Sequence, residues 1–183
     1  VVSFNNSANV VGASGTPATI QLAGGTLSLD DSTARTYTAN VVVEGPSTLV
    51  VNRASAGAAV THTLGTLSIG EQTLTVRGGA NVTSGTATAV FGATTLTGNP
   101  TFTLIPSAGA SLQVTIGALN DGGVARTLTT SGGRLVMNAA ATSMVADSRL
   151  VLNGGIAEVT NATALGSATI VVNAGKFVNN VGT

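Results

Sequence analysis

A phrase of two or three apolar residues closed by asparagine occurs four times in this chain. The copies lie at 49–52, 135–138, 150–153 and 170–173, and they end at Asn52, Asn138, Asn153 and Asn173. Small residues follow, as in Asn153-Gly154-Gly155, so we interpret the phrase as a strand that enters a tight corner where Asn or Gly accepts a left-handed backbone. A chain that repeats such a unit is most simply a solenoid, because no unit can bury its apolar face alone.

Strand candidates follow one another along the whole chain. Nearly all are short, rich in Val, Thr, Ile and Leu, and bounded by Gly, Asn, Asp or Pro. They lie at 18–22, 26–29, 40–43, 48–51, 60–64, 66–69, 73–76, 86–91, 94–97, 101–105, 111–116, 126–129, 134–137, 149–152, 156–159, 169–172 and 176–178. Only the segment 139–149 could hold a helical turn, and an irregular corner fits it equally well. The pattern predicts an all-β chain.

The spacing of the strongest apolar strands predicts the number of coils. Aligned strands recur at a mean step of about twenty residues, close to one turn of a parallel β-helix; they are centred on Leu27, Leu49, Leu74, Leu96, Leu112, Leu135, Leu150 and Ile170. We therefore expect a single-stranded parallel β-helix of about eight turns, one domain over 1–183, as a segment or repeating subunit of a longer assembly. The alternative is a pilin-like or immunoglobulin-like β-sandwich, which has no need for near-copies of one phrase.

One stretch of the chain resembles a known family. Residues 161–175, NATALGSATIVVNAG, are similar to the autotransporter-associated β-strand repeat of bacterial surface proteins, and the preceding LVLNGG at 150–155 fits the strand that leads into that repeat. The resemblance implies a right-handed parallel β-helix that is exported to the cell surface as a passenger-type region. It implies no catalytic or cofactor residues.

Composition limits the classes of partner. Charged residues make up 8% of the chain and the formal net charge is zero, so we expect no binding to nucleic acid and no attraction to an anionic membrane. No apolar run approaches the roughly 20 residues that cross a bilayer as a helix, and we expect no membrane insertion by this segment. Aromatic residues make up 3%, which favours a thin core of aliphatic layers.

The residues that could carry chemistry are few and scattered. His62 stands alone in its stretch of sequence, and we expect it at the surface or in a lateral contact. Some β-helices that cleave polysaccharides gather acids on one face, so Asp30, Asp31 and Glu44 are the acids to examine for that role. The segment 120–123 reads as a turn rather than a calcium site, because one carboxylate is a poor start for six to eight ligands. We expect no enzyme, no cofactor and no metal.

The four asparagines allow two interpretations. Either copies on neighbouring turns stack their amides into a hydrogen-bonded ladder, or each asparagine forms its own turn independently. Asn138, Asn153 and Asn173 are the copies close enough in sequence to be consecutive.

The two ends of the chain suggest how it assembles. Both ends carry apolar β-formers, and unprotected strand edges favour pairing with another chain; the residues concerned are Val1, Val2, Phe4, Phe177 and Val178. We therefore expect a structural component of an extracellular or cell-surface bacterial fibre or stalk, which binds further copies of itself end to end and also packs laterally. The alternatives are an adhesin or glycan-binding passenger module and, less favoured, a polysaccharide-active β-helix enzyme.

Overall fold

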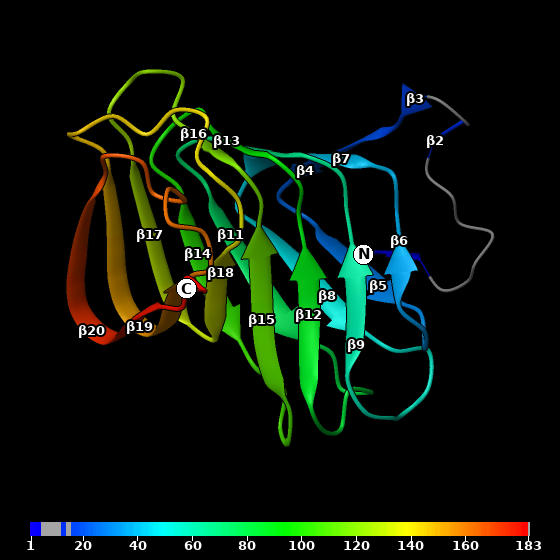
Figure 1. Ribbon diagram of the computed structural model, residues 1–183. Helices are drawn as coiled ribbons and strands as arrows, with labels where there is room; N and C mark the ends of the chain where they lie inside the picture. The colour runs from blue at the N-terminus through cyan, green and yellow to red at the C-terminus, as the bar shows by residue number, and fades with distance from the viewer. Residues whose placement is uncertain (5–11, 14–15, 183) are drawn as a thin grey trace.

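The chain folds into a parallel β-solenoid, in which the strands of successive coils stack along one axis (Figure 1). The computed structural model describes residues 1–4, 12–13 and 16–182. In this part of the chain the one antiparallel pair joins β2 (Gly12–Ala13) to β3 (Thr16–Pro17), and every other strand pair is parallel. The predicted all-β solenoid is confirmed, and the β-sandwich alternative is wrong.

Each coil, meaning one full turn of the chain around the axis, places strands on up to three faces. The first face contains β1 (Val2–Phe4), β5 (Thr26–Asp30), β8 (Ser47–Asn52), β11 (Thr73–Gly78), β14 (Thr101–Ile105) and β17 (Thr127–Gly132). The second face contains β6 (Arg35–Thr36), β9 (Val60–Thr63), β12 (Thr86–Val90), β15 (Ser111–Ile116) and β18 (Arg134–Met137). The third face contains β4 (Thr19–Ala23), β7 (Asn40–Gly45), β10 (Leu67–Ile69), β13 (Thr94–Leu96) and β16 (Leu119–Asn120).

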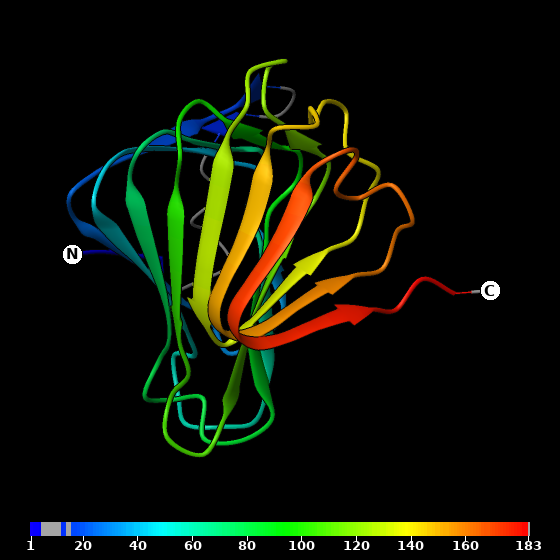
Figure 2. The same cartoon turned by 90° about the vertical axis from the view of Figure 1, so that its left-hand side faces the viewer.

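The last two strands each follow two faces. β19 (Arg149–Val159) pairs with β17 through its first half and with β18 through its second, and β20 (Thr169–Asn179) pairs with β19 along both halves. Figure 2 shows the resulting V-shaped strands at the C-terminal end. In earlier coils a loop separates the two faces; it spans 31–34, 53–59, 79–85 and 106–110 in turn, and between β17 and β18 it is reduced to Gly133 alone. The corner between the first and second faces therefore closes toward β20.

Period-two alternation explains which side chains form the core. In β8, Ser47, Leu49 and Val51 are buried, while the residues between them are partly exposed. Leu49 lies beside Leu27 of the coil before it and Val76 of the coil after it, and all three are at most 2% exposed. Full burial of one such side chain contributes about 1.5–3 kcal/mol. Since the burial depends on both neighbouring coils, the stack and not the single coil is the stable unit.

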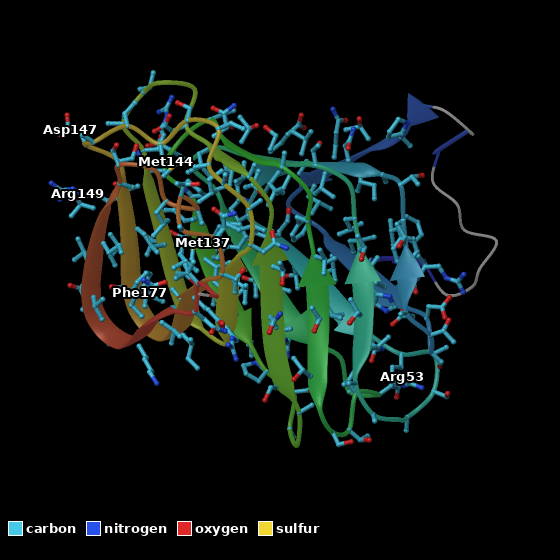
Figure 3. All side chains as sticks on the ribbon, viewed as in Figure 1. Arg53, Met137, Met144, Asp147, Arg149 and Phe177 are labelled. Atoms are coloured by element: carbon cyan, nitrogen blue, oxygen red, sulfur yellow. The ribbon has the colours of Figure 1, made fainter. Side chains whose placement is uncertain are left out.

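The segment 138–148 is irregular and contains no helix. Ser143 forms a parallel bridge with Asn120, so this segment takes the place of a third-face strand. Met144 is 6% exposed and points inward, whereas Asp147 and Arg149 lie at the surface (Figure 3). Of the two interpretations of this segment, the irregular corner is correct.

The predicted strands all overlap strands of the structure, but the number of coils is about six, not eight. The difference arises because the apolar strands that predict eight turns lie on different faces, and two strands on different faces can belong to the same turn. Leu96 on the third face and Leu112 on the second are less than one full turn apart. Paired residues on the first face show the true step, since Leu49 and Val76 are 76 − 49 = 27 residues apart and Leu152 and Val172 are 172 − 152 = 20 apart.

Glycines form a column where the first and second faces meet. Gly132, Gly155 and Gly175 have φ of +70°, +75° and +90° in successive coils. A Cβ on Gly155 would overlap the carbonyl oxygen of Gly132, and a Cβ on Gly175 would overlap that of Gly155. Glycine is therefore required here both by its backbone conformation and by the close approach of the previous coil.

We predict that Gly155→Ala lowers the free energy of unfolding by more than about 2 kcal/mol, because strain at positive φ, about 1–2 kcal/mol, adds to a backbone collision. Gly122→Ala is the matched control, since Gly122 has a φ of +68° but no atom within 4 Å of its Cβ position. Its cost is the backbone strain alone. Denaturant unfolding of both variants measures the difference, and equal losses would contradict the role of the close approach.

Candidate functional site

The C-terminal end of the solenoid exposes a layer of its core. Ile170 and Val172 on β20 are 39% and 49% exposed, whereas their partners Leu150 and Leu152 on β19 are fully buried. Among the described residues, no strand pairs with the outer edge of β20. A free strand edge beside exposed aliphatic side chains is a surface that another strand can cover.

A hollow of about 230 Å³ lies at this end, beside the exposed layer. Its apolar lining includes Val159, Leu165, Ile170 and Phe177, and Asn161 and Asn179 stand among its polar residues. The segment 160–168 forms one wall of the hollow, and the Leu165 side chain in this wall is 9% exposed. The hollow can therefore take apolar side chains from a further layer.

The N-terminal end has a different chemistry. Arg35 lies beside His62 in the next coil and pairs with Asp31 at 2.8 Å, so a charged pair stands at this end of the second face. The ring of Phe4 packs on Tyr37 at a centroid distance of 5.7 Å. A hollow of about 140 Å³ adjoins Val2 and Phe4. The end at β1 thus has an aromatic contact and a charged pair nearby, whereas the end at β20 has exposed aliphatic side chains beside a hollow that Phe177 also lines.

The five predicted end residues lie on or next to the terminal strands. Val1 precedes β1, Val2 and Phe4 belong to β1, and Phe177 and Val178 belong to the second half of β20. Val1 and Val2 are 96% and 59% exposed. β1 pairs with β5 on one side only in the described part of the chain.

The four predicted asparagines lie at two different corners. Asn153 and Asn173 occupy the bends of β19 and β20, where the Asn173 Nδ2 donates to the Asn153 Oδ1 at 2.8 Å. Asn52 ends β8 at the same corner several coils earlier, and its Nδ2 donates to the Asp30 Oδ1 at 2.7 Å. Asn138 follows β18 at the end of the second face and does not join the others. The amide ladder therefore links one pair of copies, and the other two copies act separately.

Asp121 is a buried hub that sequence reasoning missed. Its carboxylate is 1% exposed and accepts hydrogen bonds from the Ser143 and Ser148 hydroxyls and from the Val145 and Gly123 backbone amides, at 2.7–2.9 Å. Burial raises the pKa of this group, but the four hydrogen bonds outweigh burial and lower it to about 2. The carboxylate thereby fixes the irregular segment 138–148 against the coil before it.

His62 is fully buried, so the expected surface position is wrong. It shares the inward phase of β9 with Val60, and its Nε2 donates to the Asn52 carbonyl oxygen at 2.9 Å. Burial lowers the pKa of the imidazole, although the Asn52 carbonyl and the carboxylates of Asp31 and Asp30 act in the opposite direction. A neutral ring packed against Tyr37 at 5.8 Å contributes to the core.

The acids selected for a polysaccharide-cleaving role have structural partners instead. Asp30 accepts from Ser3, Ser28 and Asn52, and Asp31 accepts from Thr33 and Arg35. The Glu44 carboxylate accepts from the Gln21 amide at 3.3 Å. Within the described residues, no group of three or more His, Cys, Asp or Glu side chains could hold a metal ion.

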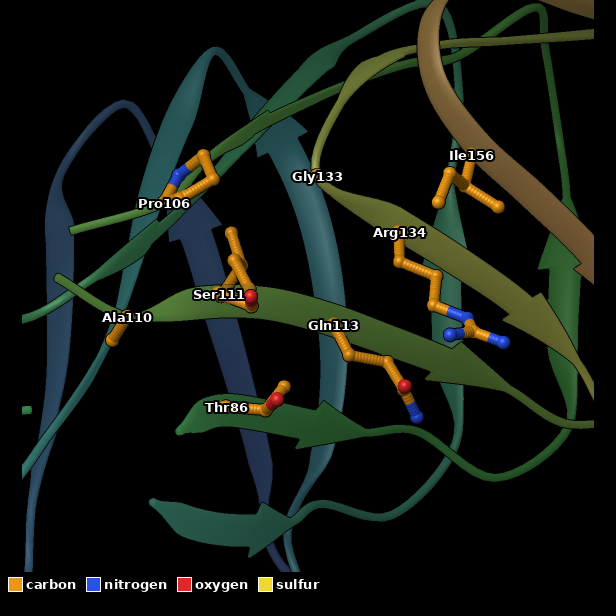
Figure 4. A pocket seen from close by; sticks show the side chains of 9 residues that line it. Thr86, Pro106, Ala110, Ser111, Gln113, Gly133, Arg134 and Ile156 are labelled. Atoms are coloured by element: carbon orange, nitrogen blue, oxygen red, sulfur yellow. The ribbon is translucent and has the colours of Figure 1, made fainter. Parts of the chain in front are cut away.

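A hollow of about 300 Å³ lies outside the second face, beside the loop 106–110 (Figure 4). Arg134 is the single ionisable side chain in its lining. The Arg134 guanidinium already donates to the Glu158 carboxylate, whose other oxygen accepts from the Asn180 amide at 2.8 Å. A hollow with one paired cation lacks the acid and base that hydrolysis requires.

Comparison with protein-family models, with curated proteins and with solved structures finds no match to this chain. No helix in the described part of the chain has the length and hydrophobicity needed to cross a bilayer. The end surfaces are therefore the features from which a function can be argued.

We predict that Asp121→Asn lowers the free energy of unfolding at pH 7 by about 2 kcal/mol, the value that corresponds to a pKa lowered from 3.8 to about 2. The folded-state pKa lies below the unfolded one, so this contribution is complete above about pH 4 and is lost as the pH falls toward 2. Urea unfolding between pH 7 and pH 2 should therefore show a weaker acid dependence for Asp121→Asn than for the wild type. Asp147→Asn, at an exposed position, is the control and should leave both quantities unchanged.

We predict that Asn153→Leu and Asn173→Leu each lower the free energy of unfolding by about 1 kcal/mol, and that the double variant loses less than the sum, because both single changes break one hydrogen bond. Asn138→Leu combined with Asn173→Leu is the control pair and should be additive, since these residues lie at different corners. Thermal unfolding measures all variants. Additive losses for the Asn153 and Asn173 pair would argue for independent turn formers.

Proposed function

We propose that this chain is a structural segment of an extracellular or cell-surface bacterial fibre or stalk, joined end to end to further copies through its terminal strands. The observation that carries the proposal is the exposed core layer on β20, where Ile170 and Val172 meet solvent beside an open strand edge. Natural β proteins protect such edges unless they use them.

The distribution of exposed apolar side chains supports assembly through the ends. Six large hydrophobic residues of the described chain are exposed, and Val1, Val2, Ile170 and Val172 account for four of them. All four lie on or next to the terminal strands of the first face, β1 and β20. Pairing of β1 of one copy with β20 of another would cover these side chains and continue the first-face sheet.

The shape and surface of the molecule suit a spacer. About six coils at a spacing of roughly 4.8 Å form a rod about 30 Å long. The zero net charge provides no long-range repulsion between neighbouring rods, which favours lateral packing as well.

The second candidate is an adhesin that binds glycans. Sugar rings are commonly held by exposed aromatic side chains, so a glycan site of this kind needs aromatic side chains at the surface. In the described structure Tyr37, Phe91 and Phe102 are buried, and Phe4 and Phe177 are partly buried against the core. A polysaccharide-active enzyme ranks third, since the acids examined above are held by structural partners.

We predict that the purified chain forms end-to-end oligomers and filaments, visible by negative-stain electron microscopy and by sedimentation velocity over a concentration series. Val172→Lys should weaken this association at least about tenfold, because it replaces an apolar contact by a charge that pairing would bury. Val124→Lys is the matched control, since Val124 is 52% exposed in the loop before β17 and lies away from both end strands. A wild-type chain that stays monomeric, or equal effects of the two variants, would overturn the proposal.

A further inference from the structure

The outer edge of β20 is bent, and a straight strand cannot follow it. Residues 169–172 pair with β19 on the first face and residues 176–179 pair with it on the second, and the register shifts between them. A strand of three residues such as β1 can cover one arm of this edge. Coverage of both arms requires a strand that bends where β20 bends.

The glycine column determines what can stand at that bend. The position of a Cβ on Gly155 is occupied by the carbonyl oxygen of Gly132, and that of a Cβ on Gly175 by the carbonyl oxygen of Gly155. In a further strand, the equivalent residue would lie against the carbonyl oxygen of Gly175 in the same way. A residue with a Cβ at this position would collide with the backbone below it and would also be strained by the positive φ of the bend.

The asparagine pair gives a second, independent requirement. Asn173 uses its amide group to donate to Asn153, and no described residue donates to the Asn173 Oδ1. An amide side chain at the equivalent position of a further coil would donate to this oxygen and continue the ladder. The same corner already carries such relays in the first coils, where Asn52 donates to Asp30 and accepts from the Asn81 backbone amide.

The arms on either side of the bend require apolar residues in the inward phase. Ile170 and Val172 continue the columns of Leu150 and Leu152, and Phe177 continues that of Ala157. Ile170 and Phe177 also border the hollow of about 230 Å³ at this end. A further coil would place its own aliphatic side chains over them.

We infer that β20 accepts a bent strand of one chemical class, with apolar residues in the inward phase, then asparagine, and glycine two residues after the asparagine. The inference rests on the proposed function, in which the solenoid is extended at this end. It limits the part of β1, because β1 of another copy covers one arm of the edge alone, whereas coverage of both arms requires a strand with this sequence. The chain contains two strands of this class, at 150–155 and 170–175, and they are the two that already bend together.

The test inserts a second copy of residues 161–180 between Asn180 and Val181 of the full chain, which matches the 20-residue step from β19 to β20. Two matched insertions differ from the first in the inserted copy alone, by Gly175→Ala or by Asn173→Leu. Hydrogen exchange followed by NMR reports on the amides of the original β20, and the amides of β11 and β14 report that the rest of the solenoid is folded.

The unchanged copy should slow the exchange of outward-facing β20 amides in both arms at least about tenfold. The copy with Gly175→Ala should lose this protection in the arm after the bend, and the copy with Asn173→Leu should retain less of it than the unchanged copy. Equal protection by all three insertions would overturn the inferred sequence requirement and leave the proposed extension of the solenoid standing. Absence of protection by every insertion, with β11 and β14 intact, would overturn both.

Discussion

Every element of this structure depends on parallel backbone pairing between consecutive coils. The coils are held by hydrogen bonds from one strand to the next and by aliphatic side chains that align because those strands are in register. A slip of one residue would turn each inward side chain to solvent. Since each coil contacts only its neighbours, stability is close to a sum of coil and interface contributions, and the outermost coils are held from one side.

Polar side chains link neighbouring coils at the places where strands end. At the corner between the first and second faces, carboxylate and amide groups bridge coils, as Asn52 does with Asp30 and Asn173 with Asn153. Where a third-face strand is missing, Asp121 collects donors from the irregular segment and replaces the lost pairing. These polar groups therefore lie at the ends or bends of strands, or where a strand is missing.

Local pattern was sufficient to predict most of the strands, because alternation and turn residues are properties of short stretches. It missed the short strands β1, β6 and β16, which have two or three residues each and therefore show no alternation. Local pattern could not give the number of coils, since Leu96 and Leu112 look alike in sequence although they lie on different faces, less than one full turn apart. The burial of His62 had a usable signal, because it shares its phase with Val60 on the same strand and with Leu64 directly after it. The Asp121 hub had none, because Ser143 and Ser148 reach it only through an irregular segment with no repeat.

The closing of the corner between the first and second faces makes the two ends of the rod different in outline. At the β1 end the loop 31–34 separates the two faces and Phe4 packs on Tyr37, whereas at the β20 end one bent strand follows both faces and exposes Ile170 and Val172. Contacts between such unlike surfaces are heterologous, so subunits that stack along this axis all point the same way. A near-pure translation along a straight axis does not close into a ring, and such an array is polar and open-ended.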